Sequence, residues 1–177
     1  ESKERINSAL KNAGVKPPSR ENRKITVNLA PADFKKTGSQ YDVAIAVGYL
    51  AATNQLADFH SEDYLFVGEL SLDGRLRPIS GALSIARLAK KKGIPFLVVP
   101  AANAAEAAII SGISVIPVKN LEQLIKHLED NAPIQAQPQT DLNFSGESPF
   151  VSIADIKGQP NAKRALMIAA AGNHNLL

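Results

Sequence analysis

GIPFLVVPAANAAEAAIISGISVIPVKNLEQLIKHL, residues 93–128, repeats one pattern twice. In each half a short apolar run ends at a proline, and an asparagine then opens a helical pattern, at Asn103 and at Asn120. Glu106 and Gln123 lie three residues after these asparagines, which is the capping-box position. A strand followed by a helix, twice in succession, predicts parallel strands joined by helical crossovers.

Upstream of this stretch, apolar residues at helical spacing predict three helices, over residues 1–13, 43–52 and 81–92. Ser39 is expected to cap the second helix, with Asp42 at its capping-box position. The eight residues after Asn120 contain an apolar stripe at helical spacing. This stripe of the second crossover helix is expected to face the core. The helix over 81–92 is expected to offer its core-facing side through Leu83, Ala86, Leu88 and Ala89.

Two segments outside these helices have the alternating pattern of β-strands. Residues 25–29 alternate apolar and polar side chains, which predicts a half-buried strand. Residues 64–72 predict a second strand, which turns at Asp73-Gly74 into residues 75–79. A three-residue loop over 73–75 would set Leu72 opposite Leu76, and we favour it because it pairs two apolar residues.

The composition excludes several kinds of site. The 177 residues include no cysteine, which removes disulfides, thiolate nucleophiles and thiolate-bound zinc. No apolar run is long enough to span a bilayer, and a cytoplasmic protein is expected. His60, His127 and His174 lie far apart, so no metal site is expected. The net charge is only +3, and its cations are unevenly distributed along the chain.

The character of the chain changes after Asp130. Residues 131–151 are rich in Gln, Pro, Ser, Gly and Thr and predict a linker. Residues 152–177 open a new element, with Pro160 at a helix start. We therefore expect a domain over 1–130, this linker, and the beginning of a second domain. A helix at the first residues and an ending on two leucines also suggest a chain that is cut at both ends.

Four blocks of sequence carry a family resemblance: NLAPAD at 28–33, GELSLDGRLRPI at 68–79, VPAANAAEA at 99–107 and DIKGQ at 155–159. They resemble the magnesium-chelatase-like AAA+ proteins of the competence protein ComM/YifB type, in order along nearly the whole chain. No Gly-x-x-x-x-Gly-Lys-Ser/Thr loop occurs in the 177 residues. In that family such a loop would follow directly after Leu177.

The resemblance implies an α/β (α+β) fold of the Lon-protease-like, ribosomal-protein-type β-α-β class, with a hairpin and parallel βα units, whose first strands would lie upstream of residue 1. The linker and the start of an AAA+ module would follow. It also implies ATP and Mg²⁺ as cofactors of the full-length protein, none in this part, and a homo-oligomeric, hexameric ring. Residues next to the nucleotide would be Ile156, Gly158 and Gln159.

Lon-type proteases use a serine that a lysine activates. Carried over by position, these residues would be Gln40 and Leu83, and neither side chain can do the chemistry. Ser39 and Ser80 lie nearby as substitutes, but we expect no catalytic residue here. The resemblance implies a non-catalytic accessory domain of an ATP-hydrolysing motor that acts on DNA, of the competence and recombination, helicase or branch-migration type.

Alternatives to a DNA role remain. They are an interaction or oligomerisation module of a metallochelatase-like or chaperone-like ATPase, and, more remotely, a residual peptidase. DNA binding would rest on the cations outside the linker, because Lys and Arg contact phosphates without regard to sequence. The candidates are Lys35, Lys36, Arg75, Arg77, Lys90, Lys91 and Lys92.

Overall fold

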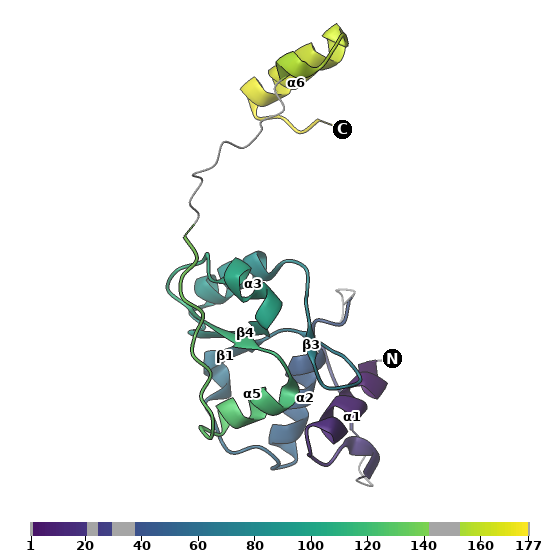
Figure 1. Cartoon of the computed structure of the whole chain (residues 1–177), viewed down its shortest axis with the longest axis vertical. Helices are drawn as coiled ribbons and strands as arrows, with labels where there is room; N and C mark the ends of the chain where they lie inside the picture. Colours follow the sequence, from purple (N-terminus) through teal and green to yellow (C-terminus); the bar gives the residue numbers. More distant parts are fainter. Residues whose placement is uncertain (1, 21–24, 30–37, 142–152, 177) are drawn as a thin grey trace. The chain divides into compact units, whose positions relative to one another are not determined.

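A computed structural model describes residues 2–20, 25–29, 38–141 and 153–176. The chain forms two compact units, residues 1–142 and residues 143–177 (Figure 1). The predicted domain limits at 130 and 151 stay predictions.

The first unit is built on a parallel sheet of three strands, in the order β1-β4-β5. These strands are β1 (Tyr64–Phe66), β4 (Phe96–Pro100) and β5 (Ser114–Val118). Tyr64, Phe96 and Ser114 share a register position, so all three strands start at the same end of the sheet. The two strand–helix repeats therefore form the parallel sheet that the sequence predicts.

Helices cover both faces of this sheet (Figure 1). On one face α1 (Ser2–Asn12), α2 (Asp42–Ala52) and α5 (Leu121–Leu128) enclose the larger core. On the other, α3 (Ala82–Lys92) packs with the short α4 (Ala104–Ala107). Because side chains alternate along a strand, Leu97 and Val99 of β4 face α3 while Val98 faces the larger core. Single 3₁₀ turns lie at Pro18–Arg20, Ser61–Asp63 and Ala101–Asn103.

The hairpin that follows β1 is formed by β2 (Glu69–Leu70) and β3 (Leu76–Arg77). Leu70, not Leu72, lies opposite Leu76, so the predicted register was wrong by two residues. The loop has the expected three residues but covers 72–74, because Gly74 is its only member at a positive φ, +83°. A three-residue hairpin loop ends on such a left-handed residue. Leu72 is consequently exposed.

Two expectations about the core were also wrong. Residues 25–29 form no strand in the described structure, and their apolar side chains are exposed. A strand requires a neighbour for its backbone groups, and none of the described residues pairs with this segment. In α3 the alanines at 82, 86 and 89 are buried, whereas Leu83 and Leu88 are exposed on its flanks. The small alanine side chains let α3 pack closely on the sheet.

The predicted helix caps had different outcomes. Asn120 caps α5, since its Oδ1 accepts from the Gln123 N–H at 2.8 Å. Ser39 does not cap α2, because its hydroxyl donates to the Glu69 carboxylate instead. Asn103 does not cap α4 either. Its side-chain amide bonds the N–H and the C=O of Ile79, at 2.9 Å each, and so holds the segment that leads into α3.

The segment after α5 lies along the first unit up to residue 141. The Gln137 N–H donates to the Val115 carbonyl at 2.8 Å, and the Thr140 N–H to the Ala108 carbonyl at 3.0 Å. The described part of the second unit contains a 3₁₀ turn at Ile153–Asp155 and the helix α6 (Pro160–Gly172). Pro160 is the first residue of α6, as the sequence predicts.

Candidate nucleic-acid interface

A buried carboxylate joins three elements beside the hairpin. Asp42, at the start of α2, is 1% exposed. It accepts from the Arg5 guanidinium of α1 at 2.8 and 3.3 Å, from the Ser2 hydroxyl, and from the Leu70 N–H of β2 at 3.3 Å. A buried charge needs such partners. The carboxylate therefore fixes α1 and the hairpin relative to α2.

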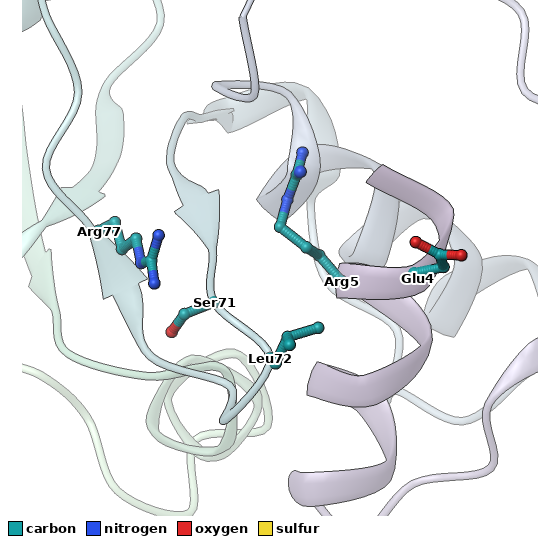
Figure 2. A pocket seen from close by; sticks show the side chains of 5 residues that line it. All are labelled: Glu4, Arg5, Ser71, Leu72 and Arg77. Carbon is teal, nitrogen blue, oxygen red and sulfur yellow. The ribbon is translucent and has the colours of Figure 1, made fainter. Parts of the chain in front are cut away.

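A groove of about 290 Å³ lies between α1 and the hairpin. Figure 2 shows Arg77 and Arg5 on opposite sides of the segment just after β2 that carries Ser71 and Leu72. Glu4 completes the lining. The groove therefore contains a carboxylate as well as two guanidinium groups, and Asp42 already engages one of these. The charges that line the groove therefore do not favour an anionic ligand over others.

Both predicted hairpin cations have an acidic partner. The Arg75 Nε lies 3.3 Å from an oxygen of Asp73, and the Arg77 guanidinium lies 3.5 Å from Glu69. Both arginines and Asp73 are exposed and Glu69 is only half-buried, so the two pairs contribute little to stability. Each pair nevertheless neutralises its arginine, so at distances longer than the separation of the two charges the paired groups have no net charge. The pKa of Asp73 is lowered, first by the hydrogen bond from the Ser71 hydroxyl.

Lys90, Lys91 and Lys92 are exposed in the last turn of α3. Helix α3 contains no acidic residue, and no ion pair is formed by these three lysines within the described part of the chain. Lys90 Nζ lies 3.5 Å from the Ser111 hydroxyl.

The topology separates these two groups of cations. Lys92 is followed four residues later by Phe96, the first residue of β4, so the lysines lie where the parallel strands start. The hairpin follows the last residue of β1, and the Leu76 N–H donates to the Lys119 carbonyl just after β5 ends. The five residues of β4 span about 16 Å. That distance exceeds the Debye length of about 8–10 Å, so the two groups act independently.

Two further exposed cations belong to these groups and are missing from the sequence predictions. Arg87 lies one helical turn before Lys91, and this spacing is readable from the sequence. Lys119 joins the hairpin only through the strand order, which no local pattern reveals. Lys35 and Lys36 lie outside the described residues.

At the two positions that the Lon resemblance singles out, Gln40 and Leu83, the residues make hydrogen bonds through their own backbone atoms. The Gln40 carbonyl accepts from the Gly68 N–H at 2.9 Å, directly before α2. The Leu83 N–H donates to Glu106 Oε1 at 3.1 Å, in the first turn of α3. Leu83 is 38% exposed, and Ser80 is exposed as well. Neither Gln40 nor Leu83 supplies a nucleophile or a base.

The histidines form no site together. His60 is exposed and lies 3.7 Å from Glu62. Nδ1 of His127 accepts from the Ile134 N–H at 3.0 Å, while its Nε2 is buried without a partner in the described structure. Burial lowers the pKa of His127, against a smaller opposing effect of Asp130. The described residues contain no group of three or more His, Cys, Asp or Glu side chains suited to a metal ion.

In the second unit, Ile156 is half-buried, whereas Gly158 and Gln159 are exposed with positive φ angles just before α6. A nucleotide contact by these residues stays a prediction. Among the described helices, none has both the length and the hydropathy of a membrane span.

Comparison with known families matches residues 1–103 to the subunit ChlI of Mg-chelatase, and residues 152–177 to a second model, magnesium chelatase, subunit ChlI. The first match covers more than half of the chain. The chain belongs to the Mg-chelatase ChlI family.

Within the ChlI family, this chain is similar along its whole length to two named proteins. It is 41% identical over 181 residues to competence protein ComM of Haemophilus influenzae and 38% identical over 177 residues to YifB of Escherichia coli. The chain spans only 35% and 34% of their lengths. A weaker similarity, 27% identity over 138 residues, relates 76% of the chain to 24% of Lon protease 2 of Bacillus subtilis. The predicted resemblance to the ComM/YifB group is confirmed.

Proposed function

We propose that this chain is a non-catalytic accessory part of a longer AAA+ ATPase that acts on DNA. Membership of the ChlI family and the similarity to a protein named for competence support the proposal. The observation that carries it is the cluster Lys90–Lys92, which forms no ion pair among the residues that the structure describes, because cations on a rigid helix suit a phosphate backbone. ATP and Mg²⁺ are assigned to the longer protein, since this chain has no phosphate-binding loop of its own.

The non-catalytic assignment rests on Gln40 and Leu83. An amide cannot be activated as a nucleophile, and an alkyl side chain cannot accept a proton. Ser39 is not assigned as a substitute nucleophile in this proposal, because its hydroxyl donates to the Glu69 carboxylate, which also pairs with Arg77, and not to a lysine amine, the base that a Lon-type serine uses.

The decisive experiment measures DNA binding and ATP turnover by the full-length protein, with and without residues 1–142. We expect salt-sensitive DNA binding that weakens when these residues are deleted, while ATP is still hydrolysed. Absence of DNA binding by the full-length protein at low salt would contradict the proposal. Cleavage of a peptide substrate by the intact protein would contradict the non-catalytic assignment.

One observation favours a second candidate, a protein-interaction or oligomerisation module. Ile25, Val27 and Leu29 are between 39% and 51% exposed, and alternating apolar side chains of this kind suit addition to another sheet. For this candidate we expect the variant Val27→Asp to change the oligomeric state of the full-length protein in sedimentation, with DNA affinity per assembled particle unchanged.

A further inference from the structure

We propose that the phosphate-binding surface of this chain lies on the second half of α3, formed by Arg87 and Lys91 on its outward side and Lys90 and Lys92 on its two flanks, and that the hairpin is not part of it. We call these four residues the α3 cation face. The inference rests on the proposed DNA function and specifies where the DNA backbone lies. Its ligand is the phosphodiester backbone of a nucleic acid, contacted without regard to base sequence.

The first argument is the contrast in net charge between the two ends of the sheet. Four cations of the α3 cation face share a helix that has no carboxylate. Near the hairpin, three ion pairs bring each arginine together with an acid, as Arg5 with Asp42, Arg75 with Asp73 and Arg77 with Glu69. Lys119 beside the hairpin takes part in none of these pairs, so one lysine remains there against four cations on α3. A polyanion is therefore attracted mainly to the end of α3.

The second argument is the direction in which these side chains point. Ala82, Ala86 and Ala89 are buried against the sheet, so residues half a turn away from them face outward. Arg87 and Lys91 occupy that outward side and are one turn, about 5.4 Å, apart along the axis. Two cations at this spacing on a rigid helix can contact one strand of a phosphate backbone together.

Small residues next to the lysines leave the surface open to a backbone. Ser111 and Gly112 are exposed beside Lys90, and a Cβ added at Gly112 would lie 3.8 Å from Lys90 Cε. The Ser111 hydroxyl, 3.5 Å from Lys90 Nζ, offers a second donor to the same oxygen. Backbone and hydroxyl donors of this kind commonly accompany cations at phosphate contacts.

Helix capping does not account for the cluster. Lysines are common in a last turn because they stabilise the negative end of the helix dipole. Here the Gly93 and Ile94 N–H groups already bond the carbonyls of Ala89 and Lys90. Arg87 lies more than one turn before the helix end, where the effect of the dipole has faded.

Two acids at this end of the sheet, Asp63 and Asp130, act on Tyr64, which packs on the other face. Glu106 lies on the α3 face but at the first turn of the helix, where its Oε1 accepts from the Leu83 N–H. Burial raises the pKa of Tyr64, and the charges of Asp130 and Asp63 raise it further. Tyr64 packs against the core of α1, α2 and α5. The sheet and its buried side chains thus stand between these carboxylates and the α3 cation face.

The test compares two double variants of the full-length protein with equal loss of charge, R87Q/K91Q and R75Q/R77Q. Binding of a fluorescein-labelled DNA duplex of mixed sequence is followed by anisotropy between about 50 and 200 mM salt. Each phosphate contact contributes about −0.9 to the salt slope, or about eightfold in affinity near 0.1 M salt. We expect R87Q/K91Q to lose about 60-fold in affinity and R75Q/R77Q to bind like the wild type.

The charge-preserving variant R87K/K91R should retain wild-type binding, which separates lost charge from lost folding. Equal losses in the two glutamine variants, or wild-type affinity of R87Q/K91Q, would overturn the assignment to α3 and leave the DNA function standing. A wild-type protein that binds no DNA would refute both proposals.

Discussion

The buried carboxylate of Asp42 gives the sharpest test of how the first unit is held together. In the variant Asp42→Asn the side chain keeps its size and can still accept from the Leu70 N–H, so no cavity forms. The Arg5 guanidinium, 21% exposed, loses its ion pair with Asp42. Breaking a buried pair costs about 3–5 kcal/mol, and we take the lower end, about 3 kcal/mol, because Arg5 is partly hydrated.

For a unit of this size, a loss of about 3 kcal/mol lowers the Tm by about 10 °C. Urea titration and thermal unfolding, both followed by circular dichroism, measure the effect. Glu122→Gln is the matched control, because it removes an exposed pair with Lys126 and should leave the Tm unchanged. Adding Arg5→Met to Asp42→Asn should recover part of the loss, since both charges of the pair are then removed together. An unchanged Tm for Asp42→Asn would refute the structural role of Asp42.

Two further predictions concern close packing and pH. Gly68→Ala should lower the free energy of unfolding by about 1–3 kcal/mol in urea titration, because the added Cβ would lie 2.9 Å from Val43 Cγ2. Gly48→Ala is the control: its Cβ would lie in open space on α2, so this variant should be neutral or stabilising. The pKa of His127 is lowered from 6.5, so the unfolded chain binds the proton more readily and stability should fall as the pH drops below about 6.5. His127→Asn, which keeps an acceptor for the Ile134 N–H, should flatten that dependence; an identical pH profile in both proteins would contradict it.

Local patterns in the sequence were sufficient for the parallel pairing of β4 with β5 and for α5. The single strand predicted over 64–72 is instead divided into β1, in the parallel sheet, and β2, in the hairpin. Two strand–proline–asparagine repeats predict parallel pairing, and the structure has it. Gly93 ends α3 with a left-handed φ of +71°, as a glycine after the last apolar position should. These features depend on residues within a few positions of each other, which is why they could be read directly.

Features that depend on distant partners were missed. Ser39 satisfies a capping pattern, but its hydroxyl donates a hydrogen bond to Glu69 of the hairpin instead. Asn103 likewise bonds Ile79 rather than its own helix. The separation of Lys90–Lys92 from Arg75 and Arg77 follows from the order of the strands in the sheet. The sequence alone could therefore not show that these cations belong to two different surfaces.

The backbone hydrogen bonds at Gln40 and Leu83 do not depend on which side chains occupy these two positions. The carbonyl of Gln40 and the N–H of Leu83 make the structural contacts, and any residue supplies these groups. We therefore expect the variant Q40S/L83K to fold with an unchanged Tm. It should gain no peptidase activity, because a lysine at the partly exposed position 83 stays hydrated and protonated, whereas a lysine base needs a dry site. Peptide turnover above the Q40A/L83K control would show that two side chains alone had been lost.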